Sequence, residues 1–283
     1  MNKNTSIPLN KRNIDFDLKT ARQRCLAYRR RILDISQQVS ALHVAPAFSC
    51  IEIVDVIYNQ LMRWSDTKNT DDVFLMSKGH GCMIQYVILE ERGILEKEDL
   101  DLYCKPEGRL GAHPDFGNPG IAASTGSLGH GMGLAVGMAY ADKLQSRSTN
   151  IFLVLSDGEC QEGSTWEAAM MAANLGLNNL IAFVDMNDFS GLERMSEGHP
   201  AFHPLLPKFK AFGWDGVEVN GHDANQILDK LQMIKDDKPF VFVCKTVKGK
   251  GVSFMEHIPI WHYRSPNKEE YVQAVGELLE IDS

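Results

Sequence analysis

Cysteines are few in this chain, and their spacing fits neither a disulfide framework nor a metal site. The six cysteines are scattered and form no CxxC pair, so we interpret them as free thiols in a reducing compartment, by default the cytoplasm. The first 15 residues are polar and lack the apolar core of a signal peptide. No apolar run approaches the ~18 residues of a membrane span. These absences disfavour a secreted, disulfide-rich protein and a membrane protein.

Positive charge is also in short supply. The chain has 29 Lys and Arg against 37 Asp and Glu, a net charge of −8, which argues against nucleic acid as the main partner. No GxGxxG follows the first apolar strand and no Walker lysine motif occurs, so a nucleotide-binding Rossmann protein is disfavoured too. The chain does have size and apolar content, with 283 residues of which 44% are hydrophobic. It can therefore bury a substantial core.

Helical and strand patterns alternate along the chain without repeats or low-complexity linkers. This alternation predicts an α/β fold with a mostly parallel sheet and helices on both faces. We expect a flexible N-terminal arm over residues 1–15, one domain over 16–265 and a C-terminal tail helix over 266–283. Apolar runs predict strands at 151–155, 180–184, 213–219 and 240–244, and helical spacing predicts helices at 18–39, 51–64 and 131–143.

The helix predicted at 131–143 contains three glycines, Gly131, Gly133 and Gly137. A glycine inside a helix costs up to ~1 kcal/mol relative to alanine. We therefore expect something to approach this helix closely, either a cofactor or another helix.

Asp157-Gly158 and Asn187 form the most informative pattern, because each lies just past the carboxyl end of a predicted strand. Open α/β sheets bind ligands at this edge. Mg2+ usually takes one or two carboxylates together with substrate phosphates. One Asp, one Asn and a loop carbonyl are therefore enough to seat a metal that holds a diphosphate. The alternative is two ordinary loop caps, since Asp-Gly is a common turn, and spacing alone leaves both open.

The segment between these two positions is similar to a known family. It runs strand, loop, helix and strand, the connection of a parallel sheet, and Ser164 followed by Glu167 has the form of a capping box. It resembles the thiamine diphosphate motif in its transketolase version, which includes a Gln-Glu-Gly that pyruvate dehydrogenase and deoxyxylulose phosphate synthase lack. Ser156 replaces the usual glycine, and we expect a small backbone adjustment there. The matching residues are Asp157-Gly158-Glu159, Gln161-Glu162-Gly163, Trp166-Glu167-Ala168-Ala169 and Asp185-Met186-Asn187.

A glycine-rich turn over residues 125–131, Thr-Gly-Ser-Leu-Gly-His-Gly, precedes the glycine-containing helix. Taken alone it is weak evidence, because such turns are common. It resembles the family's Thr-Gly-Ser-Leu-Gly-Gln-Gly, which implies backbone contacts to the cofactor at Gly126 and Leu128. His130 replaces the usual glutamine, close enough to the site to alter substrate preference.

Three histidine segments follow in the family's order. Each histidine alone is more often a surface or core residue, but their joint order and intact flanking residues favour a site. The resemblance implies that His80 and His262 lie beside the diphosphate and the reaction centre, and that His113 contacts a substrate hydroxyl. The segments are Ser77-Lys78-Gly79-His80, Ala112-His113-Pro114, and Lys245 to Gly251 continuing to Trp261-His262.

His43 occupies the place of the histidine in the family's Ser-Gly-His-Pro-Gly-Gly-Ser, although its neighbours differ. Here residues 40–46 read Ser-Ala-Leu-His-Val-Ala-Pro. We expect its role as a proton or hydrogen-bond partner of the substrate to persist. The bulkier neighbours predict a reshaped, more apolar pocket, which puts the usual pentulose phosphate donor in doubt. The remaining histidines are interpreted as structural: His199, His203, His222 and His257.

The resemblance implies a site for thiamine diphosphate and Mg2+, which Ca2+ or Mn2+ can replace. The implied metal ligands are Asp157, Asn187 and the carbonyl of Phe189. The implied catalytic residues are His43, His80, His113 and His262. The implied cofactor-binding residues are His80, Gly126, Ser127, Leu128, Asp157, Gly158, Glu159, Glu162, Asn187, Lys245 and His262.

The resemblance covers roughly residues 20–265 and exposes a missing part. In transketolases the glutamate that activates the cofactor's aminopyrimidine lies in the following pyrimidine-binding domain, and no acidic residue here matches it. The resemblance therefore implies the N-terminal subunit of a split transketolase, completed by a C-terminal subunit that carries this domain and its catalytic glutamate. The family implies a dimer of heterodimers, with Glu162 and Glu167 where carboxylates make contacts across subunits.

The implied activity is transfer of a two-carbon ketol unit from a ketose (phosphate) donor to an aldehyde acceptor. Two alternatives stay open. The first is a thiamine diphosphate-dependent carboligase or acyl transferase of a specialised sugar or natural-product pathway, which the altered His43 segment keeps in view. The second is a relative that binds a partner without turnover, which the intact Asp157, Asn187 and motif histidines disfavour.

Overall fold

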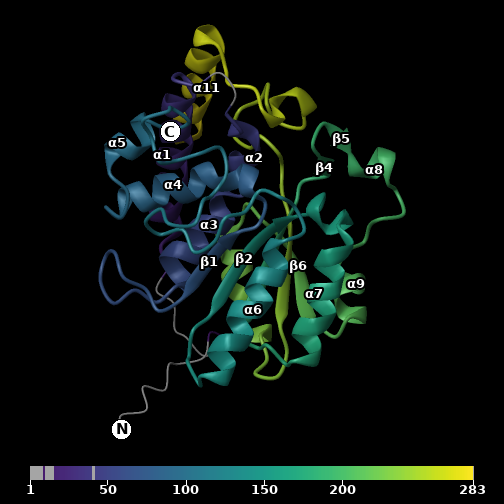
Figure 1. Ribbon diagram of the computed structural model, residues 1–283. Coiled ribbons are helices and arrows are strands. Elements are labelled where there is room, and N and C mark those ends of the chain that lie inside the picture. The colour runs from purple at the N-terminus through teal and green to yellow at the C-terminus, as the bar shows by residue number, and fades with distance from the viewer. Residues whose placement is uncertain (1–8, 10–15, 40–41, 283) are drawn as a thin grey trace.

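Five parallel strands form the central sheet in a computed structural model that describes residues 9, 16–39 and 42–282. All neighbouring strands in this sheet are parallel, so their carboxyl ends lie at one edge (Figure 1). The predicted parallel α/β fold is confirmed. Across the sheet the order is β1 (Val73–Met76), β2 (Ile151–Ser156), β3 (Leu180–Met186), β7 (Phe240–Lys245) and β6 (Asp215–Asn220).

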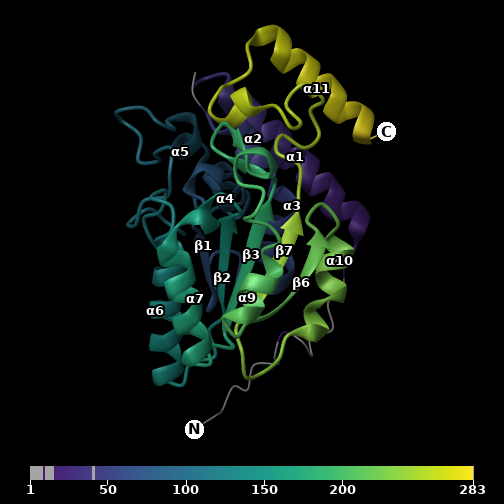
Figure 2. The same cartoon turned by 90° about the vertical axis from the view of Figure 1, so that its right-hand side faces the viewer.

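Alternate side chains of the strands face two different layers of helices. In β2, Phe152 and Val154 belong to one core cluster and Leu153 and Leu155 to the other, as the two-residue period of a strand requires. One layer contains α1 (Leu18–Ser36), α3 (Ile51–Val56), α4 (Cys82–Glu91) and α10 (Ala224–Asp229). The other contains α6 (Gly131–Leu144), α7 (Gly163–Asn174) and α9 (Leu206–Ala211), and Figure 2 shows the sheet between them.

The predicted helices and strands are present with shifted ends. The helix predicted at 18–39 is α1 and ends at Ser36, and α3 continues as a π-helical turn over Ile57–Leu61 before Met62 becomes extended. The pattern does not predict β1, because an apolar run of four residues cannot be told from a helical segment by periodicity. Pairing of β1 with β2 fixes it as a strand. The short elements are α2 (Val44–Phe48), α5 (Lys97–Asp101), α8 (Met195–Gly198) and the antiparallel pair β4 (Phe189–Ser190) and β5 (Glu193–Arg194).

Ser164 and Glu167 do not form the predicted capping box, so that expectation is wrong. Glu162 is the N-cap of α7 and makes no side-chain cap bond. The Ser164 hydroxyl instead donates to the carbonyl of Gly129 at 2.9 Å. This bond ties α7 to the glycine-rich turn that precedes α6.

The three glycines of α6 differ in their surroundings. A Cβ at Gly131 would lie 2.0 Å from the Ser77 hydroxyl oxygen, so α6 approaches the turn after β1 this closely only because this residue is glycine. A Cβ at Gly133 or Gly137 would meet no described atom within 4 Å. Close approach within this chain therefore explains the first glycine and leaves the other two facing open space.

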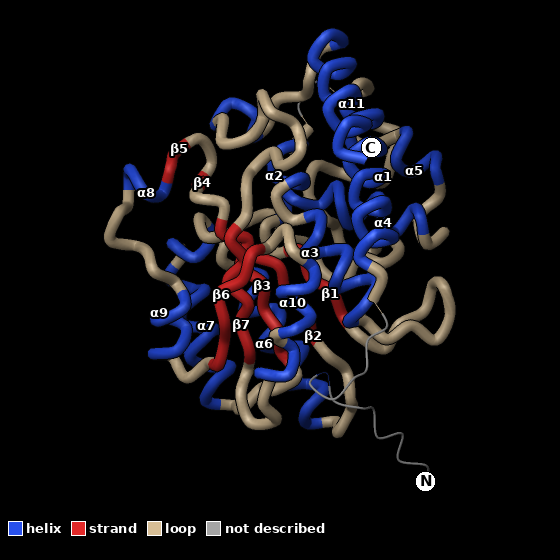
Figure 3. Tube along the Cα trace, turned by 180° about the vertical axis from the view of Figure 1, so that it is seen from behind, coloured by secondary structure: helices blue, strands red, loops and turns tan. Residues whose placement is uncertain are grey.

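The two ends of the chain differ in what the structure describes. The arm predicted over residues 1–15 lies outside the described residues, apart from Leu9, which is buried. The helix expected within 266–283 is α11 (Lys268–Asp282), which packs beside α1 (Figure 3). None of the helices described is long and apolar enough to cross a membrane.

Candidate functional site

Four histidines from separate loops converge at the carboxyl edge of the sheet. His43 precedes α2, His80 lies in the 3₁₀ turn after β1, and His262 ends the 3₁₀ turn Pro259–His262. The ring centroid of His43 lies 6.1 Å from that of His80, 5.7 Å from His113 and 5.5 Å from His262. Those of His80 and His262 are 5.2 Å apart. The structure thus brings together all four histidines that the sequence singles out.

Burial keeps three of these imidazoles neutral near pH 7. It lowers the pKa of His43 to about 4 and that of His262 to about 3, and it lowers the pKa of His80 well below its ordinary value. The ammonium charges of Lys78 and Lys248 act in the same direction. A neutral imidazole has one N–H donor and one lone pair, so each ring can donate to one ligand atom and accept from another. Nδ1 of His43 is buried without a hydrogen-bond partner among the described residues.

Asp157 is completely buried at the end of β2. Its Oδ1 accepts from the backbone N–H of Gly158 at 2.9 Å, and its Oδ2 accepts from that of Asp188 at 2.8 Å. Burial and the neighbouring Asp185 carboxylate raise the pKa of Asp157 to about 7. None of the described lysines or arginines forms an ion pair with it. A buried carboxylate in this state is the kind of group that a bound cation stabilises.

Asn187 and Phe189 place two further oxygens on the loop that faces Asp157. The Asn187 amide nitrogen donates to Ser49 Oγ at 3.0 Å and to Asp185 Oδ2 at 3.2 Å, which fixes the orientation of the amide. Its Oδ1 accepts from the Phe189 N–H at 3.0 Å. The Phe189 carbonyl oxygen would lie 3.0 Å from a Cβ at Gly158. The two loops therefore touch, and a side chain at residue 158 would crowd the Phe189–Ser190 backbone.

This donor set fits a hard divalent cation. It offers one carboxylate, one amide oxygen and one carbonyl oxygen, which is the oxygen chemistry that Mg2+ prefers when phosphate and water complete its shell. No group of three or more His, Cys, Asp and Glu side chains able to hold a metal occurs among the described residues. The site described here has only one such side chain, Asp157, because its other two oxygens come from an amide and a backbone carbonyl, so it falls outside that definition. The uncompensated Asp157 carboxylate is the observation that favours the cation.

Glu159 fastens the glycine-rich turn to the same edge. Its Oε1 accepts from the backbone N–H of Gly129 at 3.0 Å and from the hydroxyl of Ser77. Its Oε2 is buried without a hydrogen-bond partner in the described part of the chain. The turn itself requires glycine, because Gly126 has φ +116° and a Cβ there would lie 2.7 Å from the His113 ring. Leu128 is half-buried in this turn and Ser127 is exposed.

Two of the departures from the family pattern, Ser156 and His130, each make a local contact. The Ser156 hydroxyl accepts from the N–H of Glu159 at 3.1 Å and so closes the turn after β2. Nδ1 of His130 lies 3.1 Å from the carbonyl of Ser127 and 3.2 Å from that of Leu128. Because carbonyls only accept, Nδ1 carries the proton, and His130 holds the glycine-rich turn from its exposed end.

Three predicted residues lie away from the histidines. Lys245 is exposed, and its ammonium pairs with Glu218 at 2.9 Å. Glu162 and Glu167 are exposed at the start of α7. These side chains face solvent in the single chain.

Comparison with known proteins identifies the family. The chain matches the family described as transketolase, thiamine diphosphate binding domain, over residues 21–280. This chain belongs to the transketolase family. It is 37% identical over 257 residues to an apulose-4-phosphate transketolase subunit of Phocaeicola vulgatus, covering 89% of this chain and 91% of that protein. It is 36% identical over 243 residues to the 6-deoxy-6-sulfo-D-fructose transketolase subunit SqwG of a Clostridium species, covering 83% and 88%.

Solved transketolases share the fold but are much longer. The transketolase of Leishmania mexicana superposes with a TM-score of 0.83 at 26% identity, covering 91% of this chain and 41% of that one. That of Campylobacter jejuni gives a TM-score of 0.84 at 25% identity, covering 93% and 43%. The chain thus spans less than half of these transketolases but nearly all of the relatives named as transketolase subunits. The predicted membership of the transketolase family is confirmed.

The transketolase motifs contain functional candidates to which the sequence assigns no role. Lys78, Asp185, Ser49 and Thr246 form a buried polar network beside Asn187: Lys78 donates to Asp185, Ser49 donates to Asp185 at 2.7 Å, and Thr246 also donates to it. Lys248 is buried, with its ammonium 2.9 Å from Nδ1 of His262. Both lysines stand inside quoted motifs, so the motif identifies them, but only the fold shows that they are buried at the site.

Proposed function

We propose that this chain is the diphosphate- and metal-binding subunit of a two-chain transketolase. The complete enzyme transfers a two-carbon ketol unit from a ketose phosphate donor to an aldehyde acceptor. The observation that carries the proposal is the convergence of four histidines, three of them held neutral by burial, at the edge of the sheet where Asp157 is buried without an ion-pair partner among the described residues.

Asp157, Asn187 and the carbonyl of Phe189 would hold Mg2+, with Ca2+ or Mn2+ as substitutes, and the metal would neutralise a diphosphate. Bound thiamine diphosphate supplies the carbon nucleophile that carries the ketol unit. The backbone of Gly126 and Leu128 would contact this cofactor, because a glycine-rich turn exposes N–H and carbonyl groups without a Cβ in the way. Glu159 holds the turn in place through the N–H of Gly129.

The histidines would act on the hydroxyls of the donor and the acceptor. His43, His80 and His262 are neutral near pH 7, so each can take a proton at one ring nitrogen and give one at the other. His43 has the clearest opening for a ligand, since its buried Nδ1 has no partner in the described part of the chain. The Lys248 amine lies 2.9 Å from Nδ1 of His262, and burial together with the charge of Lys78 lowers its pKa to about 7, so it too can exchange a proton near neutral pH.

A partner chain with the pyrimidine-binding domain and its catalytic glutamate would complete the site. Two relatives that match over 91% and 99% of their own length are named as transketolase subunits, which supports this division. We propose a dimer of heterodimers in which the exposed Glu162 and Glu167 meet the neighbouring protomer. The six free cysteines support the cytoplasm as the compartment.

The segment around His43 affects which donor substrates we expect the enzyme to accept. Leu42, Val44 and Ala45 around His43 are fully buried residues of the hydrophobic core, so the segment that carries His43 is packed by apolar side chains where the family pattern has glycines and a proline. This favours testing unusual donors, and it keeps a carboligase or acyl transferase of a specialised pathway as the second candidate.

A donor panel with the purified two-chain complex separates the candidates. The panel contains xylulose 5-phosphate, fructose 6-phosphate, apulose 4-phosphate, 6-deoxy-6-sulfofructose and a 2-oxo acid, each offered with an aldehyde acceptor. Two-carbon extension of the acceptor from any ketose supports ketol transfer. Turnover of the 2-oxo acid alone, with release of carbon dioxide, would replace ketol transfer with the carboligase reaction.

A further inference from the structure

His222 uses both ring nitrogens to link two distant parts of the chain. It follows β6, and its side chain is 12% exposed. Nε2 accepts from the backbone N–H of Val247 at 2.8 Å, and Nδ1 lies 2.8 Å from Oε2 of Glu52. An amide N–H only donates, so Nε2 carries the lone pair and Nδ1 the proton, which it donates to Glu52. The two contacts therefore select one tautomer.

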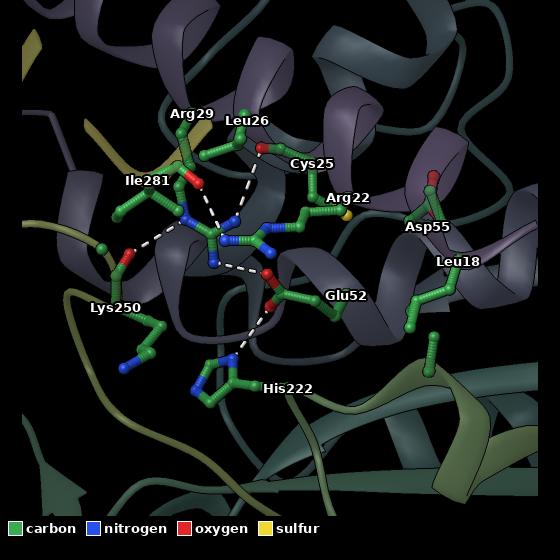
Figure 4. Close-up of a pocket in the computed structure, with 13 residues that line it drawn as sticks. Leu18, Arg22, Cys25, Leu26, Arg29, Glu52, Asp55, His222, Lys250 and Ile281 are labelled. Carbon is green, nitrogen blue, oxygen red and sulfur yellow. Dashed lines mark hydrogen bonds and ion pairs between the residues drawn. The ribbon is translucent and has the colours of Figure 1, made fainter. Parts of the chain in front are cut away.

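Glu52 and Arg29 extend this connection to the other side of the same loop. Nη2 of Arg29 lies 2.6 Å from Oε1 of Glu52, and Nε donates to the carbonyl of Lys250 at 2.9 Å. Arg29 is 4% exposed, although it belongs to a run of three arginines on α1. Figure 4 shows Arg29, Glu52 and His222 in sequence along the wall of a cavity of about 230 Å³. We call these three residues the buried relay.

The loop over residues 246–251 is held by the buried relay on its outer side and by the active-site network on its inner side. Val247 and Lys250 bond to the relay, whereas Thr246 donates to Asp185. Gly251 has φ +96°, and a Cβ there would lie 3.2 Å from Nε of Arg29. The backbone thus passes close to the guanidinium because residue 251 is glycine.

Lys248 lies between the two relay contacts and points in the opposite direction, into the site. Its ammonium donates to the carbonyl of Gly191 at 2.9 Å, lies 2.9 Å from Nδ1 of His262 and sits 4.7 Å from the centre of the Phe189 ring. The carbonyl of Phe189 is one of the oxygens assigned to the metal. A shift of the loop would therefore move the ammonium relative to both His262 and the metal loop.

We propose that Arg29, Glu52 and His222 are positioning residues that fix the 246–251 loop and thereby aim the Lys248 ammonium at the diphosphate and His262. The cofactor part of this inference rests on the proposed function. The residues come from α1, α3 and the turn after β6, and none of the three belongs to a motif that the sequence assigns to the site. Their effect on the cofactor passes through Lys248.

Amide hydrogen exchange tests the anchoring without any cofactor. His222→Ala removes the acceptor of the Val247 N–H, and exchange in residues 246–251 should accelerate about tenfold, the scale of one lost buried hydrogen bond. His222→Gln keeps an amide oxygen that can accept this N–H and should restore most of the protection. His199→Ala, at an exposed histidine of the same chain, is the control. Unchanged exchange in His222→Ala would overturn the anchoring.

A double-mutant cycle tests whether the relay acts through Lys248. The affinity of the two-chain complex for thiamine diphosphate is measured at saturating Mg2+ for wild type, His222→Ala, Lys248→Met and the double variant. His222→Ala should weaken binding about tenfold in the wild-type background and less than about twofold in the Lys248→Met background, because coupled residues are not additive. Equal losses in both backgrounds would mean a general structural role and overturn the inference.

The two measurements separate this inference from the proposed function. A complex that binds thiamine diphosphate and gives the predicted cycle, yet extends no acceptor, contradicts ketol transfer and leaves the positioning role intact. An active complex in which His222→Ala exchanges and binds like wild type contradicts the positioning role alone.

Discussion

Lys78 and Asp185 form a fully buried ion pair at the end of the sheet. The Lys78 ammonium also donates to the carbonyl of Pro46 at 3.0 Å, so its charge is committed to groups of the fold. Asp157, in the loop that follows β2, is equally buried and raised in pKa to about 7. The ends of two adjacent strands thus carry buried carboxylates in different states. Asp185 is paired with Lys78, whereas Asp157 is available to bind an external cation.

Asp157→Ala should abolish metal-dependent cofactor binding, because it removes the only carboxylate among the assigned ligands. We expect the affinity for thiamine diphosphate in Mg2+ to fall at least about 100-fold, since a ligand carboxylate is removed outright. Calorimetric titration of the two-chain complex measures this. Asp188→Asn is the matched control, because Asp188 bonds to Ser196 and its φ of +70° suits asparagine. Wild-type affinity in Asp157→Ala would rule out the metal assignment.

In the metal-free chain Asp157 should contribute a loss of stability as the pH rises from about 4 toward 7, whereas the lowered pKa values of His43, His80 and His262 contribute in the opposite direction. Burial and the Asp185 charge raise the pKa of Asp157 from 3.8 to about 7, against the opposing N–H groups of Asp188 and Gly158 and the charge of Lys78. Between those values the folded state holds a proton that the unfolded state has released, so a rising pH disfavours folding. Urea unfolding in EDTA at about pH 5 and about pH 7.5 should show that the stability of wild type relative to Asp157→Asn falls as the pH rises, because the histidines contribute equally to both proteins. The same slope in both would show that Asp157 is not the group responsible.

Lys78→Met should strongly destabilise the fold, because it leaves Asp185 charged and buried without its cation. We expect a loss of about 3–5 kcal/mol, the usual effect of removing one partner of a buried pair. The Lys78→Met/Asp185→Asn double variant should recover part of the loss, since residue 185 then carries no charge that needs a partner. Denaturant unfolding of the three proteins measures both effects, and a double variant as unstable as the sum of the two single variants would contradict the pairing.

His43→Ala should reduce turnover without weakening the cofactor. The buried Nδ1 of His43 has no hydrogen-bond partner among the described residues, and burial lowers the pKa of this histidine to about 4, so it is suited to exchange protons with a substrate hydroxyl. The expected loss in kcat/KM is about 10²–10⁴, the range for a general acid or base, with the thiamine diphosphate affinity unchanged within a factor of about two. His199→Ala controls for the general effect of removing a histidine. A variant that loses cofactor binding and activity together would place His43 at the cofactor instead.

The fold and the site differ in how far the sequence predicts them. The long apolar runs behind β2, β3 and β7 are unambiguous because strands covered on both faces are apolar at every position, whereas β1 has only four residues and needs its neighbour to define it. The four histidines can be selected by motif order. The capping box fails, because Ser164 has a tertiary partner in Gly129 that no local pattern contains. The relay of Arg29, Glu52 and His222 lies beyond sequence reasoning for the same reason, since its contacts join residues far apart in the chain.

The most direct test of the central claim is to isolate this chain from its native cell with thiamine diphosphate and Mg2+ present, and to assay what is recovered for ketol transfer. We predict a second chain carrying a pyrimidine-binding domain. The complex should extend an aldehyde by two carbons from a ketose donor, and this activity should be lost when either chain, the cofactor or the metal is removed. Recovery of the chain alone, with neither cofactor binding nor transfer, would contradict its role as half of a transketolase.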